Sequence, residues 1–152
     1  LNKTYRSSPE IIEHANKILG LNLVSAIRRD THIPVEFRQE DNLKEQLSND
    51  INNLKKNNRS IAIITKTDTE ATDIYKLLKR DFEELTLIAN NSKAFSRELV
   101  VIPSYMAKGL EYDATIVYTH TDNQFSYKER YLYYVACTRS QHHLIIYNQK
   151  EA

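Results

Sequence analysis

Three separate stretches of the chain carry residue types that could bind a nucleotide. The sequence YRS holds Tyr5 and Arg6, the sequence KGLEYD holds Gly109 and Glu111, and the sequence YVACTR ends at Arg139. Guanidinium groups bind phosphate oxygens through a planar fork, a carboxylate can accept from a ribose hydroxyl, and an aromatic ring can stack on a base. Taken together, the three stretches predict contacts to a phosphate ester and its base.

The sequence has no phosphate-binding loop of its own. Such a P-loop needs two glycines separated by four residues and followed by Lys and Ser or Thr, because backbone N–H groups must close on the phosphate. The chain has only 2 glycines, Gly20 and Gly109. We therefore expect one wall of a nucleotide site, with the other wall on a separate domain.

Each candidate residue also has a plain structural interpretation. Arg139 could cap the last carbonyls of a helix, or it could act as an arginine finger on a γ-phosphate. Arg6 could be an ordinary surface residue or a second guanidinium on the phosphates, and Tyr5 could pack at an edge or stack on adenine. Gly109 and Glu111 could belong to a solvated surface loop.

Tyr105 and Lys108 are candidates for contact with nucleic acid. The chain has 10 tyrosines and no tryptophan, and Tyr105 lies in the predicted loop before Lys108. An exposed ring there could stack on a base, as aromatic side chains do in channels for single strands, or it could simply pack in the loop.

Composition excludes several other classes of function. The net charge of +1 gives no overall basic character, so any nucleic-acid contact must be a local patch. The 5 histidines show no metal-ligand spacing, and we expect no metal site. With 2 glycines there is no Gly-x-Ser-x-Gly elbow, and Cys137 has only distant histidines as bases, so nucleophilic catalysis is not expected.

The single Cys137 excludes an internal disulfide and favours a reducing, cytoplasmic location. No run of 18 apolar residues and no charged-then-apolar leader occurs, so we expect neither a membrane span nor a signal peptide. The chain begins at Leu1 rather than Met, which suggests a piece of a longer polypeptide.

The hydrophobic pattern predicts a single α/β domain over residues 1–152, with helices flanking a mostly parallel central sheet and right-handed crossovers. Ser8 and Pro9 open one helix and Gly20 ends it, and Asp68 or Thr69 caps another. Residues 20–34 are assigned only to a loop. Helices are expected over 9–19, 41–56, 68–78 and 126–138, and strands over 35–37 at an edge, 61–64, 85–88, 99–102, 115–118 and 144–147.

Ligands of parallel sheets collect where the strands end. Because residues 108–111 follow the predicted strand 99–102, this reasoning places Lys108, Gly109 and Glu111 at the carboxyl ends of the strands. We further expect Arg6, Glu111 and Arg139 to converge on one edge of the sheet.

With these residues identified, the chain resembles the second RecA-like motor domain of UvrD/Rep-type superfamily 1 DNA helicases, and within them the HelD (helicase IV-like) branch. YRS at residues 5–7 is similar to motif IV, and residues 61–67 are similar to the family's IAVLYRTN strand. VIPSYMAKGLEY at 101–112 resembles motif V, and ERYLYYVACTRS at 129–140 resembles motif VI. Four matches in the correct order cover most of the chain.

The resemblance implies a three-layer RecA-like fold of the P-loop NTPase type, without its own P-loop. It implies that Arg6 and Arg139 contact the γ-phosphate of ATP, Glu111 the ribose, and Tyr5 the adenine, with Gly109 beside them. Tyr105 and Lys108 would contact single-stranded DNA. The Walker motifs and the Mg²⁺ site would belong to an N-terminal motor domain of the same polypeptide, so the isolated chain is expected to be inactive.

Two features depart from the family pattern. Motif V of the family usually reads TLHSAKGLEF, whereas Pro103 and Tyr105 replace its Thr and His, which puts in doubt the DNA contact attributed to that His. The family also inserts a large subdomain (2B) before motif V, but only about 20 residues separate Leu78 from Leu99. That insertion is therefore missing.

Three functions remain open at the level of sequence. The first is an ATP-driven helicase or translocase on single-stranded DNA. The second is a HelD-type ATPase that remodels or releases RNA polymerase, which the near-zero net charge and the missing insertion slightly favour. The third is a non-catalytic α/β module, against which the presence of Arg6, Glu111 and Arg139 counts.

Overall fold

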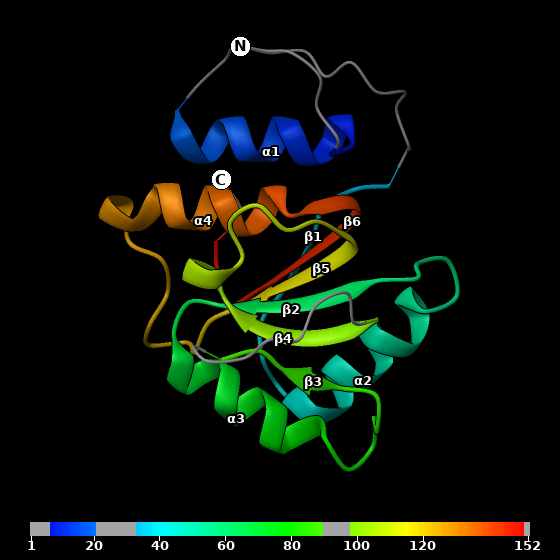
Figure 1. Cartoon of the computed structure of the whole chain (residues 1–152). Coiled ribbons are helices and arrows are strands. Elements are labelled where there is room, and N and C mark those ends of the chain that lie inside the picture. Colours follow the sequence, from blue (N-terminus) through cyan, green and yellow to red (C-terminus); the bar gives the residue numbers. More distant parts are fainter. Residues whose placement is uncertain (1–6, 21–32, 90–97, 151–152) are drawn as a thin grey trace.

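The computed structural model describes residues 7–20, 33–89 and 98–150. In these residues six strands form one sheet of order β1-β6-β5-β2-β4-β3, and every neighbouring pair is parallel (Figure 1). The predicted mostly parallel sheet is thus wholly parallel in the described residues. The strands are β1 (Glu36–Arg38), β2 (Ile61–Thr65), β3 (Thr86–Leu87), β4 (Leu99–Pro103), β5 (Tyr112–Tyr118) and β6 (Ser140–Tyr147).

Helices cover both faces of the sheet and make three layers (Figure 1). One face carries α1 (Pro9–Leu19), α4 (Arg130–Thr138) and the 3-10 turn η1 (Ser104–Met106). The other face carries α2 (Leu43–Leu54) and α3 (Asp68–Leu78). A second 3-10 turn, η2 (Tyr127–Glu129), leads directly into α4. The predicted α/β class is confirmed.

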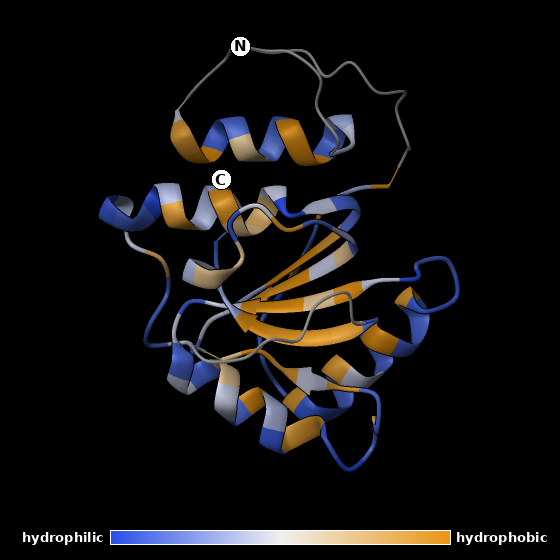
Figure 2. Cartoon of the chain, in the orientation of Figure 1, coloured by the Kyte–Doolittle hydropathy of each residue, from blue (hydrophilic) through white to orange (hydrophobic). Residues whose placement is uncertain are grey.

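The core consists of two apolar layers divided by the sheet. In β2, Ile61 and Ile63 pack towards α2 and α3, while Ala62 and Ile64 pack towards α1 and α4. A strand covered on both faces has no polar side to its sequence, which is why residues 61–64 form an unbroken apolar run. The central strands are accordingly the most hydrophobic part of the ribbon in Figure 2.

The ends of α1 follow the predicted signals. The Ser8 hydroxyl accepts from the backbone N–H of Ile11, Pro9 is the first helical residue, and Gly20 ends the helix with φ of 72°, where a side chain would be strained. For α3 the predicted cap was wrong. Thr67 caps it, in a capping box with Glu70 that satisfies two backbone N–H groups at once.

Several boundaries also differ from the prediction. β5 and β6 begin three and four residues earlier than predicted, at Tyr112 and Ser140, which are both buried and pair with each other. β3 is reduced to two residues at the edge. The first turn of the predicted helix over 126–138 is η2, so the α-helix begins at Arg130.

Two further observations bear on the kind of molecule. None of the described helices is long and apolar enough to cross a membrane. Within residues 7–20, 33–89 and 98–150, no three His, Cys, Asp or Glu side chains are grouped so as to hold a metal ion.

Candidate functional site

Glu111 and Arg139 lie together at the edge where the parallel strands begin, here called the amino edge. Each immediately precedes a strand, since Tyr112 and Ser140 open β5 and β6 and pair with each other in register. The backbone N–H of Tyr112 donates to the carbonyl of Arg139 at 2.9 Å. The two predicted nucleotide residues therefore share one edge, as expected.

The predicted location of that edge was wrong. Sequence reasoning placed Glu111 at the carboxyl edge, where the strands end, because it follows β4. However, β5 runs parallel to β4, so the connecting residues 104–111 must return to the other end of the sheet. They do so across the face that carries α4, with Ala107 fully buried in the core and Gly109 at φ of 85°.

Gln141 fixes the side chain of Glu111 beside Arg139. Its Nε2 donates to Oε1 of Glu111 at 2.9 Å. Its backbone carbonyl accepts from the N–H of Ser8 at 2.9 Å, which attaches the start of α1 to the same place. The residue therefore contacts both Glu111 and the start of α1, and it lies two positions after Arg139 in the sequence. We did not single it out, because a lone glutamine at a strand start carries no sequence signal.

Arg139 occupies the C-terminal end of α4. Its Nε donates to the carbonyl of Val135 at 3.0 Å, and its Nη2 donates to Oγ1 of Thr138 at 3.2 Å. This is the capping arrangement that the sequence allowed as the structural alternative. The contacts use two of the five N–H donors of the guanidinium group. Partial burial lowers the pKa of Arg139, and the neighbouring Glu111 carboxylate opposes that effect.

The segment that carries the first motif is fastened to both sides of Arg139. The hydroxyl of Ser7, 4% exposed, donates to the carbonyl of Ser140 at 2.6 Å, with the carbonyl of Thr138 as a longer second acceptor at 3.3 Å. Tyr5 and Arg6 themselves lie outside the described residues. Their predicted contacts, and the convergence of Arg6 with Arg139, stay predictions.

Tyr105 sits apart from the amino edge, at the other end of the sheet. Tyr105 is in η1, directly after β4 ends, and its hydroxyl donates to Oδ1 of Asp68 at 3.0 Å. The tyrosine side chain is 49% exposed, and Lys108 is exposed in the segment that returns to the amino edge. The motif V stretch is thus divided between the two ends of the sheet.

At the carboxyl edge, the loop after β5 is held by two side chains that sequence reasoning passed over. Lys66 forms an ion pair with Glu129 at 2.7 Å, and its ammonium group also bonds Oδ1 of Asn123 at 3.1 Å. Glu70, 1% exposed, accepts the backbone N–H of His120 at 2.7 Å. The only sequence signal was the Thr67-x-x-Glu70 spacing of a capping box. Residues 119–126 therefore cover the ends of β2 and β5.

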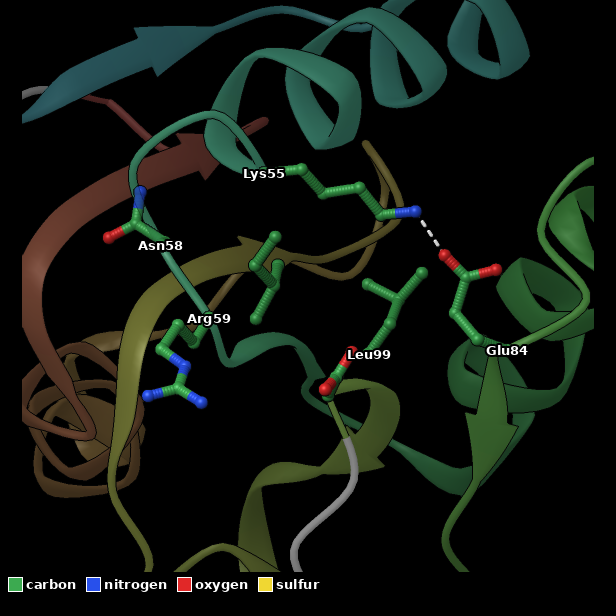
Figure 3. A pocket seen from close by; sticks show the side chains of 7 residues that line it. Lys55, Asn58, Arg59, Glu84 and Leu99 are labelled. Atoms are coloured by element: carbon green, nitrogen blue, oxygen red, sulfur yellow. Dashed lines mark hydrogen bonds and ion pairs between the residues drawn. The ribbon is translucent and has the colours of Figure 1, made fainter.

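A pocket of about 310 Å³ opens at the amino ends of β2 and β4 (Figure 3). An ion pair between Lys55 and Glu84 spans it, and Arg59 stands on its other side. Of the described residues, Lys55, Asn58, Arg59, Ile61, Glu84, Glu98 and Leu99 line this pocket, and Gly109, Glu111 and Arg139 do not.

Comparison with solved structures gives a likeness over nearly the whole chain. The crystal structure of the C-terminal domain of a possible DNA helicase from Lactobacillus plantarum WCFS1 superposes with a TM-score of 0.77 and 28% sequence identity, covering 95% of this chain and 87% of that one. No family model and no curated protein matches the chain. The fold is RecA-like, and the likeness supports a helicase C-terminal domain.

Proposed function

We propose that the chain is the second motor domain of an ATP-dependent DNA helicase or translocase. In this proposal it completes an ATP site whose phosphate cradle lies on a first motor domain. The observation that carries the proposal is the meeting of Glu111, Arg139 and the Ser7 anchor at one edge of the sheet. The likeness to the C-terminal domain of a possible DNA helicase supports it.

Arg139 would act on the γ-phosphate during hydrolysis. Its capping contacts hold the group through Nε and one Nη2 hydrogen, which leaves three N–H donors to meet phosphate oxygens. Charge spreads over the γ-phosphoryl oxygens as the bond to the leaving oxygen breaks, so a fixed guanidinium favours the transition state over bound ATP. Helix capping and catalysis are thus compatible, because the capping hydrogen bonds orient the guanidinium group that would act on the phosphate.

Glu111 would bind the ribose and Tyr5 the adenine, with Gly109 allowing the backbone before Glu111 to turn. The Glu111 carboxylate is oriented by Gln141 and remains exposed at the amino edge. A carboxylate held in this way can accept from a ribose hydroxyl. Arg6, adjacent to Ser7, would supply the second guanidinium. Mg²⁺ would be held by the first motor domain and would neutralise phosphate charge there.

The arrangement also offers a route between ATP and DNA. Tyr105 and Lys108, the proposed contacts to single-stranded DNA, precede Glu111 in one continuous segment that packs on α4. Helix α4 ends at Arg139. Closure of the two motor domains on ATP would therefore move parts of the chain that also contact DNA, as in other enzymes that close around a nucleotide.

The test compares ATP hydrolysis by the isolated chain with hydrolysis by the full-length protein. We expect no significant turnover from residues 1–152 alone, with or without single-stranded DNA. We expect DNA-stimulated turnover once the first motor domain is present. Turnover by the purified chain alone, abolished by Arg139→Ala, would disprove the shared site.

A second candidate is a HelD-type ATPase whose principal partner is RNA polymerase. One observation favours it, namely the short connection from α3 through β3 to β4, which leaves no room for the large insertion of the UvrD/Rep type. Co-purification of the full-length protein with RNA polymerase, together with ATP-dependent release of the polymerase from DNA, would decide for this candidate. DNA unwinding without polymerase would decide for the first.

A further inference from the structure

The η2 turn and the first turn of α4 expose aromatic rings that the core does not need. Tyr127 is 76% exposed and Tyr131 is 60% exposed, although the opposite side of the helix buries Tyr133 and Cys137. Tyr127 belongs to the 3-10 turn η2 and Tyr131 to the first turn of α4, so both exposed rings lie where η2 joins the helix. Tyr131 is also stacked on Tyr134, with ring centroids 6.0 Å apart and an interplanar angle of 12°.

A guanidinium group already stacks on one of these rings. The Cζ atom of Arg130 lies 3.9 Å from the ring centroid of Tyr127, and its Nη1 donates to the Tyr127 carbonyl at 2.9 Å. These two contacts fix the cation and the ring relative to each other before any partner arrives. We call the surface formed by Tyr127, Arg130 and Tyr131 the aromatic face.

The charges around the aromatic face are positive. Lys128 lies in η2, between Tyr127 and Arg130 in the sequence. The turn η1 packs against α4, and the chain continues from it to Lys108. The one acid among residues 127–131, Glu129, is turned to Lys66 in an ion pair of 2.7 Å. An incoming anion therefore meets cations here, and the one carboxylate within this segment is already engaged.

Flat rings combined with unopposed cations fit one class of partner best. Nucleobases stack on aromatic side chains without regard to sequence, while arginine and lysine neutralise the backbone phosphates. Double-stranded nucleic acid keeps its bases stacked inside and offers no free base faces to the rings. A protein partner would need acidic groups of its own to match the cations. A single strand offers both base faces that can stack on the rings and phosphates that can pair with the cations.

We propose that the aromatic face binds single-stranded nucleic acid, with bases stacking on Tyr127 and Tyr131 and a phosphate on Arg130. The strand would continue the path that Tyr105 and Lys108 begin, since η1 lies against α4. The choice of a single strand as ligand rests on the proposed helicase function. That proposal names only Tyr105 and Lys108 as contacts to single-stranded DNA. The inference adds a second contact region on a helix outside that loop.

The test measures binding of a fluorescent oligothymidylate to the full-length protein by anisotropy, over a series of salt concentrations. We expect Tyr127→Ala and Tyr131→Ala each to weaken binding by roughly 5- to 150-fold, as for loss of one stacked base. Tyr131→Phe keeps the ring and should bind as the unchanged protein does. Arg130→Gln should reduce the slope of log K against log salt by about 0.7, as for one phosphate contact on a single strand.

A matched control lies on the opposite layer. Lys79 in the turn after α3 sits over the ring of Tyr75 at 5.8 Å, in a cation–aromatic pair like that of Arg130. Lys79→Gln removes a comparable surface charge and should leave both the affinity and the salt slope unchanged. Thermal unfolding of each variant verifies that the exposed substitutions leave the fold intact.

The outcomes separate this inference from the proposed function. If Tyr105→Ala weakens binding while the Tyr127→Ala, Tyr131→Ala double variant binds normally, the inference is wrong and the proposed function stands. If that double variant binds the oligonucleotide normally but loses ATP turnover, the inference is again wrong, and the effect of Tyr131 runs through the nearby Arg139. If the unchanged protein binds no single strand, both fail.

Discussion

The hydroxyl of Ser7 lies 2.6 Å from the carbonyl oxygen of Ser140, across a separation of 133 residues in the sequence. The contact joins the residue that follows Arg6 to the residue that follows Arg139. The proposed action of both guanidinium groups on one phosphate needs backbones that are fixed relative to each other. A buried hydroxyl between them provides that constraint, because a carbonyl left without its donor in this position is costly.

Ser7→Ala should lower the free energy of unfolding by about 1–2 kcal/mol, because it leaves the buried carbonyl of Ser140 without this donor. It should also reduce ATP turnover in the full-length protein beyond what the loss of stability explains, since Arg6 loses its anchor. Urea denaturation and steady-state kinetics measure the two effects. Ser48→Ala, in α2 on the opposite layer, serves as the control and should change neither. Wild-type turnover in Ser7→Ala would show that the contact is only structural.

Gln141→Ala should raise the KM for ATP while leaving kcat nearly unchanged. The glutamine orients the Glu111 carboxylate at 2.9 Å, and Glu111 is proposed to bind ribose equally in the ground state and the transition state. Loss of one such hydrogen bond corresponds to about 1 kcal/mol, or roughly fivefold in KM. Gln124→Ala at the opposite edge should leave KM unchanged. A fall in kcat without any rise in KM would contradict this role for Glu111.

His14 should make the domain sensitive to mild acid. Burial lowers the pKa of His14 to about 4 from 6.5, and Lys17 adds to the shift. The unfolded chain therefore binds the proton first as the pH falls. The stabilisation is complete above pH 6.5 and is lost progressively between pH 6.5 and about 4, by on the order of 3 kcal/mol.

His14→Phe provides the comparison, because it keeps a ring against Phe37 and Tyr133 but cannot titrate. Urea denaturation at several pH values should show a smaller loss of stability between pH 6.5 and 4 in the variant than in the unchanged chain. Equal losses in the two proteins would mean that other groups cause the acid sensitivity.

The sequence predicted the fold well where burial alone decides the pattern. The apolar run of β2 needs a sheet that is covered on both faces, and the short β1 after Pro34 is at an edge as expected. Polar strand starts gave no such signal. Asp113 and His142 lie inside β5 and β6 at the point where the register between the two strands shifts. The N–H of Asp113 donates to Oγ of Ser60 at 2.8 Å, a contact that hydrophobic periodicity does not register.

The place of Glu111 in the fold was not predicted correctly. Glu111 was assigned to the carboxyl edge because it follows a strand, although the parallel strand after it requires the chain to return to the amino edge first. Gln141 could not be found at all, because its importance comes from two contacts that exist only after folding. For Arg139 the sequence allowed two roles, a helix cap and an arginine finger. The structure shows the capping contacts.

The most direct test of the proposed shared ATP site is turnover against nucleotide affinity in Arg139→Ala, in the full-length protein. A guanidinium that acts mainly on the transition state should leave nucleotide binding almost intact while turnover falls by about 10³–10⁵. Arg139→Lys should recover little of this, because an ammonium lacks the planar fork. Arg59→Ala, also at the amino edge, is the control and should turn over normally. Near-normal turnover in Arg139→Ala would contradict the account and leave Arg139 as a helix cap.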